Sequence, residues 1–118
     1  MAQRIYTELT SLLAELAGKK PMLICGNSFD RLSIAGKIPE MVQFREFSPN
    51  PKYEDVCKAV ELFRNSGCDC LLAVGGGSAM DVAKCVKLFA PMDAQTNYLT
   101  QPYEDSGILL AAIPTLLW

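Results

Sequence analysis

Apolar and polar positions follow two different spacings along this chain, and the two spacings alternate. Apolar residues recur at helical spacing over residues 5–16 and stop before Gly18, which predicts a helix that ends there. The apolar run at residues 21–25 predicts a buried strand. Residues 29–35 follow as a short predicted helix, and residues 42–47 alternate apolar and polar side chains as a second strand does.

A second helix is predicted after the turn Pro49-Asn50-Pro51. Asn50 suits the N-cap and Pro51 the first helical position, and Gly67 marks the expected end of this helix. The buried faces of this helix and of the next one are expected to carry Val56, Ala59, Val60 and Phe63, and then Val82, Ala83, Val86 and Phe89.

The last part of the chain repeats the alternation. Residues 68–74 predict a third strand, a helix follows the glycines after it, and residues 108–113 predict a fourth strand beyond a polar connection at residues 91–105. Strands that alternate with helices form a parallel sheet with both faces covered. We therefore expect an α/β fold built on an open parallel sheet with helices on both faces.

The turn Gly75-Gly76-Gly77-Ser78 joins a predicted strand to a predicted helix. Glycines admit positive φ angles and let an anion approach the main chain, while the next helix offers unpaired N–H groups and the positive end of its dipole. Ser78 and Asp81 also resemble a capping box, and glycines occur in ordinary turns. A plain turn needs fewer glycines, however, although the spacing matches neither G-x-G-x-x-G nor a P-loop. This turn favours a nucleotide or dinucleotide ligand.

Three clusters of turn residues follow the carboxyl ends of predicted strands. They are Gly26-Asn27-Ser28, Pro49-Asn50-Pro51 and the glycine-rich turn at residues 75–78. Each cluster alone is typical of a structural turn. Open parallel sheets bind ligands beyond the carboxyl ends of their strands, so we expect the three clusters to face one crevice.

Composition narrows the class of partner. With 118 residues, half of them apolar, the chain can bury one core and form one domain. The net charge is −2 and the charges are mixed along the chain, so no nucleic-acid partner is expected. No apolar run reaches the length of a membrane span, and residues 1–4 lead into an amphipathic segment instead of a signal-peptide core. We expect a soluble protein that is not exported and has no membrane partner.

Five cysteines lie in the apolar segments, and their odd number does not suit a closed disulfide framework. They are predicted to be buried free thiols in a reducing compartment, which favours a cytoplasmic location. Cys68 and Cys70 would share one face of a strand with Asp69 on the other, but no second ligand pair accompanies them for a metal. The chain contains no histidine, which removes most zinc and iron sites and the commonest general base.

Three stretches of the chain resemble the N-terminal domain of the iron-containing alcohol dehydrogenases. They are residues 48–51, residues 68–84 and residues 112–115, in the same order and spacing as in that family. The resemblance covers roughly residues 20–115, and its most specific part is the pattern Gly-Gly-Gly-Ser-x-x-Asp-x-x-Lys. Glycerol dehydrogenases and dehydroquinate synthases share this domain, but these motifs are closest to the alcohol dehydrogenase branch.

The resemblance implies that residues 1–118 form a Rossmann-like, dinucleotide-binding domain. In the family a helical domain with iron or zinc follows, and hydride passes between a nicotinamide and a small alcohol or aldehyde. By position, Gly76, Gly77 and Ser78 correspond to pyrophosphate binders. The other correspondences are Asp81 near the nicotinamide with Lys84 as its companion, Asn50 near the adenosine ribose, and Thr115 as the first of two threonines that contact the cofactor. The expected cofactor-binding residues are Gly26, Asn27, Ser28, Asn50, Gly75, Gly76, Gly77, Ser78, Asp81 and Thr115, with no catalytic or metal-binding residue among them.

Two departures from the family pattern change these expectations. NAD-preferring members often carry Asp after the first strand, where this chain has Gly26, so NADP is favoured over NAD. After Thr115 the family continues with a second Thr, a Gly-Thr-Gly-Ser-Glu run and the metal-binding domain, whereas this chain reads Leu116-Leu117-Trp118. We therefore expect a truncated chain without that metal-binding domain, inactive by itself.

Two alternatives from other classes stay open at this point. The chain could be a standalone nucleotide-binding or interaction module without hydride chemistry, or a ligand-free structural remnant. Residues 108–118 would expose apolar surface and a strand edge, which favours self-association. A homo-oligomer is therefore expected, with this segment buried against another copy or folded back over its own sheet.

Overall fold

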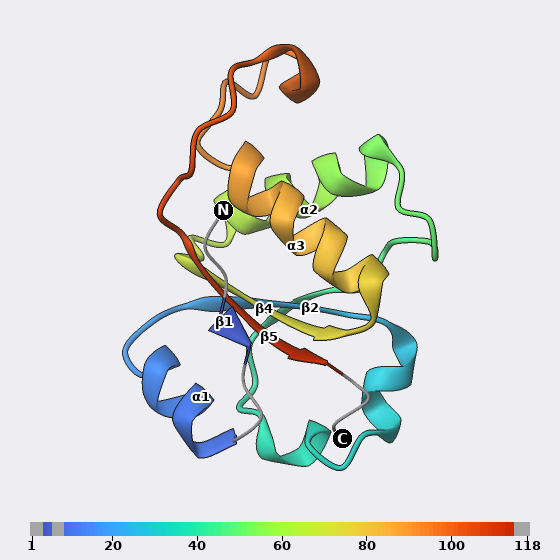
Figure 1. The fold of residues 1–118 in the computed structure, drawn as a ribbon, viewed down its shortest axis with the longest axis vertical. Coiled ribbons are helices and arrows are strands. Elements are labelled where there is room, and N and C mark those ends of the chain that lie inside the picture. Colours follow the sequence, from blue (N-terminus) through green and yellow to red (C-terminus); the bar gives the residue numbers. More distant parts are fainter. Residues whose placement is uncertain (1–3, 6–8, 115–118) are drawn as a thin grey trace.

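The computed structural model describes residues 4–5 and 9–114, which form one five-stranded sheet between two layers of helices (Figure 1). All of the pairs are parallel, and the strand order is β1-β5-β4-β2-β3. The strands are β1 (Arg4–Ile5), β2 (Pro21–Cys25), β3 (Val42–Phe44), β4 (Cys70–Gly75) and β5 (Leu109–Pro114). The helices are α1 (Leu9–Leu16), α2 (Tyr53–Asn65) and α3 (Gly77–Phe89), with short 3₁₀ helices η1 (Asn27–Arg31), η2 (Ala35–Lys37) and η3 (Tyr98–Thr100).

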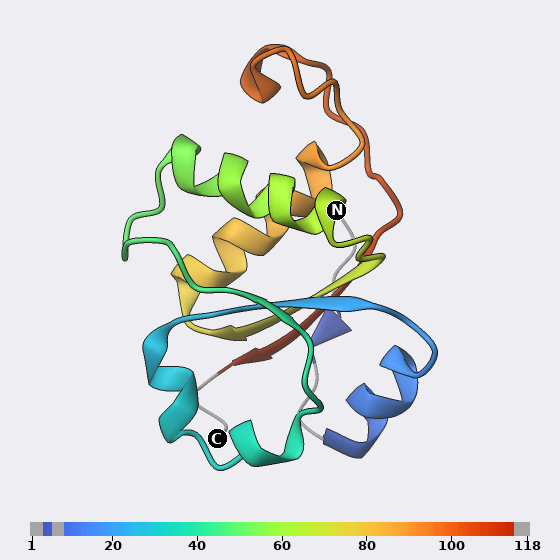
Figure 2. The ribbon, with the colours of Figure 1, turned by 180° about the vertical axis from the view of Figure 1, so that it is seen from behind.

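The two faces of the sheet bury two separate cores, because side chains alternate along each strand. On β4, Leu71 and Ala73 pack under α2 and α3, whereas Leu72 and Val74 pack against α1, η1 and η2. The view from behind shows the same arrangement, with α2 and α3 on one side and α1 with the 3₁₀ turns on the other (Figure 2). The expected α/β fold with a doubly covered parallel sheet is confirmed.

Most predicted elements are present with small shifts of their ends. The strand at residues 21–25 is confirmed, while the strands expected at 68–74 and 108–113 begin two and one residues later, as β4 and β5. All eight side chains predicted for the buried faces of α2 and α3 are buried. No helix within the described residues is both long enough and apolar enough to cross a membrane.

The structure departs from the sequence pattern at four places. Asn50 is not the N-cap of α2: Lys52 is, and its N–H donates to Asp55 Oδ2 at 3.1 Å. Residues 29–35 form no single helix but parts of η1 and η2, and β3 ends at Phe44 instead of at residue 47. The polar connection at residues 91–105 contains η3, which Asn97 caps by accepting a bond from the Leu99 N–H at 2.8 Å.

The predicted helix over residues 5–16 is wrong at its beginning. Ile5 lies in β1, where it pairs with Ala112 of β5, and α1 begins at Leu9. Backbone groups along the outer side of β5 therefore find partners in β1, which accounts for the strand. β1 covers the expected open edge of β5 at Ala111 and Ala112. The predicted homo-oligomer is untested, and residues 115–118 lie outside the described residues.

Replacing Leu72 by Ala tests the role of β4 as the central, doubly buried strand. Leu72 is fully buried, so we expect Leu72→Ala to lower the free energy of unfolding by about 2–5 kcal/mol. The matched control is Leu99→Ala, because the side chain of Leu99 is 57% exposed and its loss should change stability by no more than about 0.5 kcal/mol. Urea unfolding monitored by circular dichroism measures both. Equal losses would contradict the arrangement.

Candidate functional site

The chain leaves the sheet in opposite directions after β2 and after β4. β2 continues into η1 on one face, and β4 continues into α3 on the other (Figure 1). The two strands are neighbours in the sheet, with Cys25 paired to Val74, so Gly26 and Gly75 follow directly paired residues. Open α/β sheets bind their ligands at such a reversal of direction, beyond the carboxyl ends of neighbouring strands.

The turn between β4 and α3 uses its glycines for different reasons. Gly75 has a φ of +146°, a conformation that residues with a Cβ rarely adopt. Gly76 is the N-cap of α3 and makes no side-chain cap bond, so the proposed capping box between Ser78 and Asp81 is not what starts this helix. The first N–H groups of α3 have no partners within the helix, and they point out of its amino-terminal end.

Gly76 and Gly77 leave open space beside the main chain. Both residues are exposed, both have ordinary φ values, and a Cβ added at either would meet no atom within 4 Å. Packing within the described protein therefore does not account for glycine at these two positions. Glycine at these positions leaves the main chain open to an anionic group at the start of a 13-residue helix, because no Cβ stands in its path. The turn fits a phosphate or pyrophosphate.

The loop at residues 48–51 is tied to this turn. The hydroxyl of Ser78 donates a hydrogen bond to the carbonyl oxygen of Pro49. Within the loop, the hydroxyl of Ser48 donates to the carbonyl oxygen of Asn50 at 2.8 Å. Two of the three expected turn clusters are thus held against each other, and the exposed Asn50 lies one residue from the carbonyl that Ser78 contacts.

The loop after β2 presents small and neutral groups at the same edge of the sheet. Gly26 has a φ of −91° and nothing within 4 Å of an added Cβ, and Asn27 and Ser28 are exposed. The loop is held by Phe29, which is buried and whose N–H donates to the Gly26 carbonyl at 3.1 Å. The expected lack of a carboxylate at residues 26–28 thus leaves this part of the edge uncharged.

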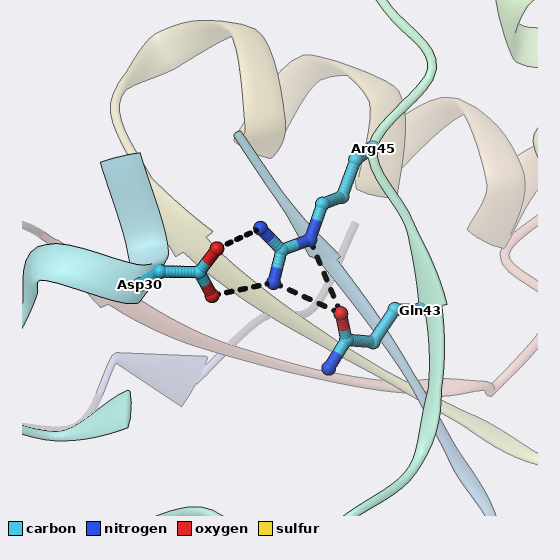
Figure 3. A network of polar contacts seen from close by, with 3 residues as sticks. All are labelled: Asp30, Gln43 and Arg45. Atoms are coloured by element: carbon cyan, nitrogen blue, oxygen red, sulfur yellow. Dashed lines mark hydrogen bonds and ion pairs between the residues drawn. The ribbon is translucent and has the colours of Figure 1, made fainter. Parts of the chain in front are cut away.

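A charged network stands beside this loop that the sequence analysis did not single out. Arg45, directly after β3, donates from Nη1 and Nη2 to the two carboxylate oxygens of Asp30, both at 3.0 Å (Figure 3). It also donates from Nε and Nη2 to Oε1 of Gln43, at 3.1 and 3.0 Å. The hydrogen bonds from Arg45 lower the pKa of the Asp30 carboxyl, which stays ionised at neutral pH. A prediction that ended this strand at Phe44 would have placed Arg45, a charged residue, directly after the strand end.

Two further expected residues follow the turn on α3. Asp81 is exposed, and Lys84 is half-buried one turn further along. Thr115 lies outside the described residues, but Pro114 before it pairs with Gly75 in the sheet. The structure shows no role for Asp81 or Lys84.

Burial keeps four of the five cysteines in the thiol form. Burial, with a smaller contribution from Asp69, raises the pKa of the Cys70 thiol to about 12, and burial also raises the pKa of Cys25, Cys68 and Cys85. These thiols stay protonated at neutral pH. All five cysteines are free as expected, but only Cys25 and Cys70 are buried, and Cys68 precedes β4 instead of sharing a strand with Cys70. Within the described residues no group of three His, Cys, Asp or Glu could hold a metal ion.

A cavity of about 440 Å³ lies elsewhere, between α2 and residues 94–98. Two of its polar side chains serve to hold that segment. Tyr53 accepts a bond from the Tyr98 N–H at 2.8 Å, and Arg64 donates to the Tyr98 hydroxyl at 3.1 Å and to the Ala90 carbonyl at 2.8 Å. The cavity therefore lies where residues 94–98 pack on α2, away from the turn between β4 and α3.

Comparison with known proteins identifies the family of this domain. The family profile described as iron-containing alcohol dehydrogenase matches residues 2–117. Among curated relatives, the 4-hydroxybutyrate dehydrogenase of Cupriavidus necator is 31% identical over 109 residues, which cover 82% of this chain and 28% of the relative. The chain thus spans little more than a quarter of that relative's length.

Solved structures share the fold. An iron-containing alcohol dehydrogenase from Thermococcus thioreducens has a TM-score of 0.74 at 27% identity, over 95% of this chain and 35% of that one. A sulfoacetaldehyde reductase from Bifidobacterium kashiwanohense, solved in complex with NAD+, has a TM-score of 0.70 at 23% identity, over 97% of this chain and 34% of that one. The described sheet is the fold that these proteins contain.

Two glycine substitutions separate the structural glycine of the turn from an exposed one. Gly75→Ala places a Cβ at a φ of +146° and 3.4 Å from the Ala79 Cβ, so we expect it to lower the free energy of unfolding by about 1–3 kcal/mol. Gly77→Ala lies in the first turn of α3 with open space around it and should leave stability within about 0.5 kcal/mol or raise it. Thermal and urea unfolding compare the two. A larger loss in Gly77→Ala than in Gly75→Ala would show that the turn geometry is wrong.

Proposed function

This chain belongs to the iron-containing alcohol dehydrogenase family, and we propose that it is the dinucleotide-binding part of an oxidoreductase that acts on a small alcohol or aldehyde. The observation that carries the proposal is the turn at residues 75–78, where two exposed glycines leave room for a pyrophosphate at the start of α3. The bound dinucleotide would supply the hydride donor or acceptor.

The residues around the turn divide the work of binding. The N–H groups at the start of α3 bind and orient the pyrophosphate, with no side-chain charge required. Ser78 holds the loop at residues 48–51 beside the turn through its bond to Pro49, which sets Asn50 close to the adenosine side of the cofactor. In this proposal Gly26, Asn27 and Ser28 form a neutral surface for the adenosine ribose, Asp81 lies toward the nicotinamide, and Thr115 is a further contact to the cofactor.

The metal of the family does not fit the described residues. They contain no set of three possible ligands, and the sequence has no histidine to complete one. We therefore assign no metal ligand to this chain, and in our proposal the iron or zinc belongs to a metal-binding helical domain of the kind that family members carry.

We propose that NADP is preferred over NAD. A carboxylate after β2 would accept hydrogen bonds from a ribose 2′-hydroxyl and would repel a 2′-phosphate. The residue at this position is Gly26, and the side chains that follow it are neutral and exposed. Nothing at residues 26–28 opposes the additional phosphate of NADP.

Calorimetric titration of the chain with NADP and NAD tests the binding step. We expect weak binding with a dissociation constant of about 1 mM or below for NADP and a higher one for NAD. Gly77→Ala should weaken both by about tenfold without loss of stability, because its Cβ enters the space kept for the pyrophosphate. Absence of saturation with both dinucleotides at millimolar concentration would refute the proposal, and tighter binding of NAD would refute the preference.

Turnover assays test the separation between cofactor binding and chemistry. We expect the 118-residue chain to oxidise no simple alcohol and reduce no simple aldehyde when Fe²⁺ or Zn²⁺ is added, because it has no histidine and its described residues offer no ligand set for the ion. Gly76→Asp is the blank, since a carboxylate at the pyrophosphate position should abolish cofactor binding. Metal-stimulated turnover above this blank would overturn the expectation.

A further inference from the structure

We infer that Arg45 is the residue that recognises the 2′-phosphate of NADP, and that Asp30 occupies its guanidinium when no nucleotide is bound. This inference rests on the proposed function, since it concerns the adenosine end of the same site. It assigns a specificity role to the Arg45–Asp30 pair, which is separate from the turn glycines and from the loop at residues 26–28.

The position of Arg45 suits this role. Ile24 pairs with Phe44 in the sheet, so Arg45 follows β3 beside Cys25, the last residue of β2. Its charge acts on the Cys25 thiol, whose pKa it lowers against the larger effect of burial, which raises it. The guanidinium carbon also lies 5.5 Å from the centre of the Phe29 ring, within the loop that carries Gly26. The cation therefore stands at the carboxyl edge beside the place proposed for the ribose.

The guanidinium is held independently of Asp30. Gln43 accepts bonds from Nε and Nη2 (Figure 3). The guanidinium also lies over the Phe29 ring. Asp30 takes the two terminal nitrogens in a bidentate pair, which is the geometry in which arginine also binds a phosphate. A dianionic phosphate could replace the carboxylate while Gln43 and Phe29 keep Arg45 in place.

The two partners differ in exposure, and this difference indicates which one moves. The Arg45 side chain is 23% exposed and the Asp30 side chain 69%. Ion pairs with a largely exposed partner contribute little stability, so the release of Asp30 to solvent costs little. Asp30 then competes with the 2′-phosphate for Arg45 and opposes its binding through like charge. NAD lacks this phosphate and therefore does not displace Asp30.

The test uses two small probes, adenosine 2′,5′-bisphosphate and 5′-AMP, which differ only in the 2′-phosphate. We expect the unaltered chain to bind the bisphosphate at least about fivefold more tightly than 5′-AMP in calorimetric titration. Arg45→Gln should remove this preference by weakening the bisphosphate about tenfold and leaving 5′-AMP unchanged. Asp30→Asn should strengthen the bisphosphate about threefold, again without effect on 5′-AMP.

Lys37→Gln is the control, because it removes one exposed cation from η2, outside the network. It should leave the ratio of the two affinities unchanged. If the Asp30–Arg45 pair had a purely structural role, both variants would bind both probes more weakly. An unchanged ratio of the two affinities in Arg45→Gln and Asp30→Asn would overturn this inference but not the proposed function. Tighter binding of the bisphosphate by Asp30→Asn cannot come from misfolding. Asp30→Asn therefore stays decisive even if Arg45→Gln has a folding defect. Absence of binding of both probes and of NADP would overturn the proposed function and this inference together.

Discussion

The pairing of β2 with β4 is the constraint on which the rest of this molecule depends. Both strands are almost entirely buried, with one core above the sheet and another below it, so their register is held from two sides. Because Cys25 lies opposite Val74, the loops after the two strands start side by side and leave on opposite faces. This divergence of the two loops accompanies the sheet order and marks the place where open α/β sheets bind their ligands.

The anion-binding role proposed for the candidate site depends on the main chain. Gly75 takes a backbone angle that lets β4 turn into α3, and Gly76 and Gly77 keep the helix start uncovered. The site has no cluster of metal ligands among the described residues, and the protein has no histidine, so the role that we propose for its own groups is to bind and orient a ligand. This is the division of labour expected where a cofactor carries the reaction.

The spacing of apolar residues predicted the core well because this spacing reflects which side chains are buried. The apolar faces of α2 and α3 and the run at residues 21–25 are where the pattern placed them. The errors arose where hydrogen bonding decides. Ile5 continues an apolar helical spacing, yet it lies in β1, where it pairs with Ala112 of β5, more than a hundred residues away in the chain. The Asp30–Arg45 pair was missed for the same reason, since it joins a loop to a strand end that no local pattern connects.

Amide chemical shifts of the isotopically labelled chain during titration with NADP test the central claim most directly, because they report where along the backbone the ligand binds. The account predicts that the largest shifts occur at residues 75–79, with further shifts at residues 26–30 and at Arg45. It also predicts that the amides around the cavity between α2 and residues 94–98 stay unchanged. Shifts confined to that cavity, with the turn after β4 unaffected, would contradict it.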